Sequence, residues 1–127
     1  MQSARLLLAG LPPMVARFFT DAAVAHAPTA VVVTLAATPD LLMEVARTAA
    51  EIVVVSVSEE EGAALAARLF RTSSVRVVIR LSTSGDRADL HSRDAPPRQA
   101  AALDAGELLD QALSLAVARE RRPDGRS

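Results

Sequence analysis

Short runs of apolar residues alternate along the chain with segments in which apolar residues recur every three or four positions. The runs are almost continuous in Val, Ile and Leu, and they predict strands at Arg5–Ala9, Thr29–Ala36, Glu51–Val57 and Val75–Leu81. The periodic segments predict helices at Met14–Ala27, Pro39–Ala49, Ser58–Arg71 and Asp104–Arg121. Ser58 and Glu61 have the spacing of a capping box, which supports a helix start there.

The strands are apolar at successive positions instead of at every second one. Strands of this kind are buried on both faces, which predicts a parallel sheet with helices on each side. We therefore expect an open three-layer α/β domain. The segment 82–97 is rich in Ser, Gly, Asp, Arg and Pro and shows little periodicity, so a fourth crossover helix is weak or missing. Ala88, Leu90 and His91 are the candidates for a short fifth strand at the sheet edge, and residues 83–103 should be the least regular region.

Two polar features of the predicted strands and helices leave alternatives open. Arg76 and Arg80 are four residues apart in the fourth strand and project to one face. Either helices cover that face incompletely, or each arginine reaches solvent from an edge. His26 and His91 are far apart in sequence and share no metal-ligand spacing, so we expect surface positions for both.

Composition excludes several classes of chemistry. The 127 residues contain no Cys, Trp or Tyr, and all fourteen basic residues are Arg. Disulfides, thiolate catalysis, zinc–sulfur sites and every mechanism that needs a lysine amine are therefore excluded. The net charge is −1 and no long basic stripe is present, so this domain alone is not expected to bind nucleic acid. We predict no catalytic residue, no metal site and no cofactor.

The size indicates one domain, 1–121, followed by a tail or linker at 122–127. The apolar runs are shorter than the roughly 20 residues that span a bilayer, so no membrane association is expected. The start of the chain does not have the pattern of a signal peptide, and we expect a cytoplasmic location.

The pattern resembles the receiver domain of bacterial response regulators, especially receivers joined to a LuxR-type helix-turn-helix. RLLLAGLPPMV matches the first strand, the acidic pair, the variable residue and the proline that opens the first helix, with Pro13 as that proline. EVARTAAEIVVVSV is similar to the end of the second helix and the third strand. The resemblance covers residues 4–82 well and 104–118 loosely. It implies a flavodoxin-like sheet in the order 2-1-3-4, with any fifth strand short.

The same alignment implies that the phosphorylation site is degenerate. The acidic pair falls on Gly10 and Leu11, and the phosphoacceptor aspartate falls on Ser56. No lysine exists, and Arg93 is the nearest substitute for the lysine of receivers. No carboxylate is left at these positions to hold the Mg²⁺ that phosphoryl transfer needs.

Apolar arcs on the first and last helices are wider than a sheet-packing helix needs. In the receiver arrangement these helices lie side by side, so Phe18, Phe19, Leu109 and Leu113 are the candidate face of a homodimer.

The functional hypothesis is a non-phosphorylatable, receiver-like regulatory module, not an enzyme. It would act by dimerisation or by binding a heterologous protein in signal transduction of the two-component type or in transcription regulation. The alternative is a ligand-sensing module of the same fold, with a small-molecule effector in the cleft at the carboxyl ends of the strands. The sequence does not identify a partner, an effector or a following DNA-binding domain.

Overall fold

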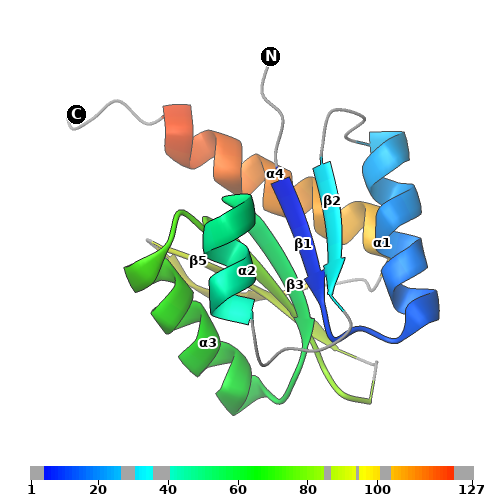
Figure 1. The fold of residues 1–127 in the computed structure, drawn as a ribbon, viewed down its shortest axis with the longest axis horizontal. Helices are drawn as coiled ribbons and strands as arrows, with labels where there is room; N and C mark the ends of the chain where they lie inside the picture. The colour runs from blue at the N-terminus through cyan, green and yellow to red at the C-terminus, as the bar shows by residue number, and fades with distance from the viewer. Residues whose placement is uncertain are drawn as a thin grey trace.

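A computed structural model of the chain describes residues 5–26, 31–35, 41–84, 87–93, 95–100 and 104–121. It confirms a mixed α/β architecture with a mostly parallel sheet and helices on both sides (Figure 1). The strands are β1 (Arg5–Ala9), β2 (Val31–Leu35), β3 (Ile52–Ser56), β4 (Val77–Leu81), β5 (Ala88–Ser92) and β6 (Ala95–Gln99). The helices are α1 (Pro13–His26), α2 (Leu41–Thr48), α3 (Glu59–Thr72) and α4 (Ala105–Arg121). The predicted start of the second helix at Pro39 and the predicted tail 122–127 lie outside the described residues.

The six strands lie in the order β2-β1-β3-β4-β5-β6. The pairs β1–β2, β1–β3 and β3–β4 are parallel. Alternate residues of each central strand enter two separate apolar cores. Leu6 and Leu8 pack with α1 and α4 on one face, whereas Leu7 and Ala9 pack with α2 and α3 on the other. This division explains the continuous apolar runs, because both faces of the central strands are buried.

The last two strands form a hairpin, which differs from the prediction. β5 pairs antiparallel with β4, and β6 pairs antiparallel with β5. The expected short fifth strand is confirmed, since Ala88, Leu90 and His91 lie in the five-residue β5. The expectation that residues 83–103 are the least regular region is wrong, and so is the edge position of the fifth strand. The described residues between β4 and β5 contain no helix, and a connection this short can join only antiparallel strands.

β6, not β5, is the outermost strand on this side of the sheet. It contains Pro96 and Pro97, both exposed. Because proline has no backbone N–H, these two positions cannot donate hydrogen bonds to a further strand. The hairpin thus closes the sheet with an edge that is poorly suited to pairing.

Helix α3 begins as its sequence predicts. The Ser58 hydroxyl accepts a hydrogen bond from the backbone N–H of Glu61, and the Glu61 carboxylate accepts one from the backbone N–H of Ser58. Asp104 similarly caps α4, because its carboxylate accepts from the backbone N–H of Glu107 at 3.1 Å.

Candidate functional site at the carboxyl edge of the sheet

Gly10 and Ser56 come together at the carboxyl ends of β1 and β3. The two strands pair Ala9 with Val55, so Gly10 and Ser56 follow on adjacent strands. Gly10 has a φ of 65°, a left-handed conformation that suits glycine at the turn into α1. Leu11 is half-buried against the α1/α4 core. These three positions therefore bring no carboxylate to this edge.

Arg93 lies at the other end of the parallel strands, near the amino end of β4. The suggestion that it substitutes for the receiver lysine is therefore wrong. It follows Ser92, which pairs with Val77 at the start of β4. Its Nε donates to the carbonyl of Val75 at 3.1 Å, and its other nitrogens donate to the carbonyls of Phe70 and Ser73. The guanidinium also lies 5.5 Å from the centre of the Phe70 ring. Arg93 therefore holds the carbonyl end of α3, where a cation is favourable.

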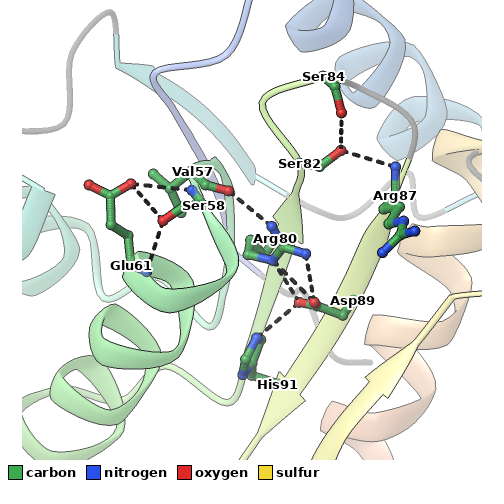
Figure 2. Close-up of polar contacts among 9 residues, drawn as sticks. All are labelled: Val57, Ser58, Glu61, Arg80, Ser82, Ser84, Arg87, Asp89 and His91. Atoms are coloured by element: carbon green, nitrogen blue, oxygen red, sulfur yellow. Dashed lines mark hydrogen bonds and ion pairs between the residues drawn. The ribbon is translucent and has the colours of Figure 1, made fainter.

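A buried ion pair between Arg80 and Asp89 lies behind the carboxyl edge (Figure 2). Arg80 is 5% exposed and Asp89 is 6% exposed. Arg80 Nη2 donates to Asp89 Oδ2 at 2.8 Å, and Nε lies 3.2 and 3.1 Å from Oδ1 and Oδ2. The third nitrogen, Nη1, donates to the carbonyl of Val57 at 3.0 Å. Each nitrogen of the guanidinium thus has a partner.

Arg80 is neither under an incomplete helical cover nor reaching solvent from an edge, so both alternatives proposed from sequence are wrong for it. Helix α3 covers it so closely that a Cβ added to Gly62 would lie 2.9 Å from Arg80 Cγ and closer still to Cδ. Arg76 differs, because its side chain is 29% exposed and lies 3.7 Å from a Glu51 carboxylate oxygen.

His91 completes the buried cluster, and its predicted surface position is wrong. Its Nε2 lies 2.9 Å from Asp89 Oδ1, with the ring 8% exposed. Since the carboxylate accepts, Nε2 is the donor in this contact. Asp89 and His91 share one face of β5, while Ala88 and Leu90 face the α1/α4 core.

The hydrogen bonds that Arg80 donates to Asp89 raise the pKa of Arg80 above its ordinary value, and the charges of Asp89 and Glu59 act in the same direction. Burial opposes this effect by disfavouring the charged form. Arg80 therefore remains a cation at every physiological pH. Its charge is balanced inside the molecule by Asp89.

The loop between β4 and β5 is organised around Ser82. The Ser82 hydroxyl accepts from the backbone N–H of Arg87 at 3.0 Å, and the Ser82 N–H donates to the Arg87 carbonyl at 2.9 Å. The hydroxyls of Ser82 and Ser84 are 3.4 Å apart (Figure 2). These contacts join the described residues on the two sides of the connection between β4 and β5.

The chemistry available at this edge is limited. No group of three or more His, Asp or Glu within the described ranges could hold a metal ion. Arg80, the buried arginine among the described residues, uses each of its three nitrogens in a hydrogen bond within the protein. The arrangement links the end of β3, β4 and β5 into a fixed unit, because Arg80 contacts Val57 and Asp89 at once.

The predicted dimer face is only partly at the surface. Phe19 and Leu109 are 2% and 1% exposed and belong to the core, so their assignment to an exposed face is wrong. Leu113 is half-buried against the same core. Phe18 is 56% exposed. Neighbouring side chains on a helix point about 100° apart, so one phenylalanine enters the core and the other does not.

A groove of about 340 Å³ lies between β6 and α4, on the α1/α4 side of the sheet. It is lined by Arg98, Asp110, Gln111, Ser114 and Leu115. These residues come from the hairpin edge and not from the carboxyl ends of the parallel strands.

Comparisons of the chain with protein-family models, with curated proteins and with solved structures found no match. In the part of the chain that the structure describes, no helix combines the length and the apolar character needed to cross a membrane.

Proposed function

We propose that the protein is a non-enzymatic regulatory module with a receiver-like, flavodoxin-like arrangement of β1–β4, which acts through protein contacts and is not phosphorylated on aspartate. The observation that carries this proposal is the carboxyl edge. Gly10, Leu11 and Ser56 stand there without a carboxylate, on parallel strands in the order β2-β1-β3-β4.

The Arg80 cluster supports the same proposal. A receiver switches when the loops at this edge rearrange around a phosphoryl group, as the resemblance implies. Here Arg80 holds the residue after β3, Val57, to the buried carboxylate of Asp89. A loop held by a buried ion pair resists such a rearrangement, which suits a module with one constitutive surface. The antiparallel hairpin after β4 is a departure from the receiver pattern.

No observation among the described residues favours the ligand-sensing alternative. The groove lined by Arg98 and Asp110 lies at the hairpin edge, between β6 and α4, and not at the carboxyl ends of the parallel strands.

The test is incubation with a small acyl-phosphate donor and Mg²⁺, followed by intact-protein mass spectrometry. We expect no phosphoryl adduct and no Mg²⁺-dependent change in Tm, because the metal-binding carboxylates are missing. A Mg²⁺-dependent adduct would contradict the proposal.

A matched variant tests whether β1 and β3 are arranged as in a receiver domain. Leu11→Asp with Ser56→Asp places two carboxylates at the edge while keeping Gly10, whose φ of 65° suits glycine. If the arrangement is receiver-like, this variant gains a Mg²⁺-dependent rise in Tm that the native chain does not have. If circular dichroism shows that the variant is folded but Mg²⁺ does not raise its Tm, the proposed receiver-like arrangement is contradicted.

A further inference from the structure

The exposed apolar side chains of the described surface gather on one helix. Four large hydrophobic residues are exposed on the described surface. Three of them lie on α1: Met14 at 68%, Phe18 at 56% and Val24 at 68%. The fourth, Met43, is on α2. The opposite side of α1 is buried in the core through Phe19.

The three residues share their side of α1 with two opposite charges. At 100° per residue, Met14, Arg17, Phe18, Asp21 and Val24 fall within an arc about 120° wide. Arg17 and Asp21 are both exposed. Neither of them makes an ion pair or hydrogen bond with its side chain in the described part of the chain, so both charges are available to a partner.

We propose that this face of α1 binds the same face of a second copy, with the two helices antiparallel about a twofold axis. An axis beside the middle of α1 places Arg17 opposite Asp21 of the second copy, and Asp21 opposite its Arg17. The same placement sets Met14 opposite Val24 of the second copy and brings the two Phe18 rings near the axis. The proposal rests on the proposed function, since it names the partner of the interaction module.

The charge pattern of this face of α1 fits a second copy of the same chain. A twofold interface uses one patch on both subunits, so the patch must complement itself. A basic and an acidic residue at equal distances from the centre of an apolar patch meet this condition. A helix of 14 residues is about 21 Å long, so a single helix pair forms a small interface and a weak dimer.

Sedimentation equilibrium up to high micromolar concentration tests the proposal. We expect a reversible dimer in the native chain, and Phe18→Ala should raise its Kd about tenfold or more, because buried aromatic anchors dominate such interfaces. Arg17→Asp and Asp21→Arg should each weaken the dimer, whereas Arg17→Asp combined with Asp21→Arg should restore it. That restoration separates a contact between copies from a general loss of solubility.

Met43→Ala is the matched control, because Met43 is 69% exposed but lies on α2, outside the proposed face, and this change should leave the Kd unchanged. A strict monomer overturns this proposal but leaves the phosphorylation result, and with it the proposed function, unaffected. A dimer that is insensitive to Phe18→Ala and to the charge reversals also overturns it. Thermal unfolding of every variant confirms that the monomer is folded, since all changed residues are exposed.

Discussion

Arg80 and Asp89 form a buried ion pair near the carboxyl ends of the parallel strands. Removing two charges from water costs several kcal/mol for each ion, and the cost is offset only where geometry and hydrogen bonds are good. Here every guanidinium nitrogen has an acceptor, and the carboxylate also accepts from His91. Both charges of the pair are therefore hydrogen-bonded, and the loss of Asp89 leaves Arg80 and His91 buried without this partner.

Asp89→Ala should lower the free energy of unfolding by about 3–5 kcal/mol, because it leaves the Arg80 cation buried and uncompensated. Urea unfolding followed by circular dichroism measures the change. Arg80→Met combined with Asp89→Leu is the control. This double variant removes both charges and should recover most of the lost stability. A loss below about 1 kcal/mol for Asp89→Ala would mean that water reaches Arg80 and that the pair is not a buried one.

At the scale of the elements, the sequence predicts the four parallel strands and all four helices. The reason is that each of these elements has a strong local signal. β1 is predicted at its observed bounds, because a strand buried on both faces is a continuous apolar run. The capping box of Ser58 and Glu61 identifies the start of α3 in the same way.

The pairing of the hairpin was missed because neither of its strands has the continuous apolar run of the central strands, although Ala88, Leu90 and His91 are candidates for a short strand. β6 reads APPRQ, and two prolines argue against a strand except at an edge, which is where it lies. β5 reads ADLHS, where Ala88 and Leu90 alternate with Asp89 and His91. Such alternation is typical of an antiparallel strand with one polar face. The burial of Asp89 could have been predicted only by pairing Asp89 with Arg80 across a short turn. Such a contact between strands is not encoded in the secondary-structure propensities of single residues.

Gly62→Ala should destabilise the protein by about 1–3 kcal/mol, the usual effect of overpacking. An exposed helical glycine replaced by alanine normally gains up to about 1 kcal/mol, so the sign is the informative part. Gly62→Ala should be destabilising because the added Cβ would lie too close to Arg80 Cγ and Cδ. The Arg80 side chain cannot easily move away, since Asp89 and Val57 hold its end. Chemical denaturation of both proteins gives the difference in stability.

The same substitution in a background of Arg80→Ala and Asp89→Ala is the control for this close packing. There the new methyl group has space, and Gly62→Ala should become neutral or stabilising. The difference between the two backgrounds measures the coupling between Gly62 and Arg80. Equal effects in both backgrounds would show that helix propensity, and not the contact with Arg80, determines the result.

In the whole molecule, two arginines join the hairpin to the segments that flank α3, one near each end of the strands. Arg80 joins β4 to Asp89 of β5 and to Val57, the residue after β3. Arg93 follows β5 and binds carbonyls at the end of α3 and before β4. The hairpin is therefore held to the parallel part of the sheet by charged side chains as well as by strand pairing. Guanidinium groups suit this task, because they offer several donors in a fixed plane and stay charged.

This dependence on arginine predicts how stability varies with pH. All fourteen basic residues are Arg, and Lys, Tyr and Cys are absent. Any α-amino group titrates near pH 8 and arginine only above about pH 12, so no side chain changes its protonation between about pH 9 and about pH 11. The raised pKa of Arg80 means that its stabilising contribution is fully present below the pKa of arginine in the unfolded chain and is lost only above it. The free energy of unfolding, measured with urea, should therefore stay constant across this window.

Arg80→Lys is the control, because stability should fall as the pH rises through the pKa of that lysine and its pair with Asp89 is lost. A fall of about 1 kcal/mol or more in the native chain would contradict the prediction, since proton linkage would then require a titrating group that the sequence does not contain.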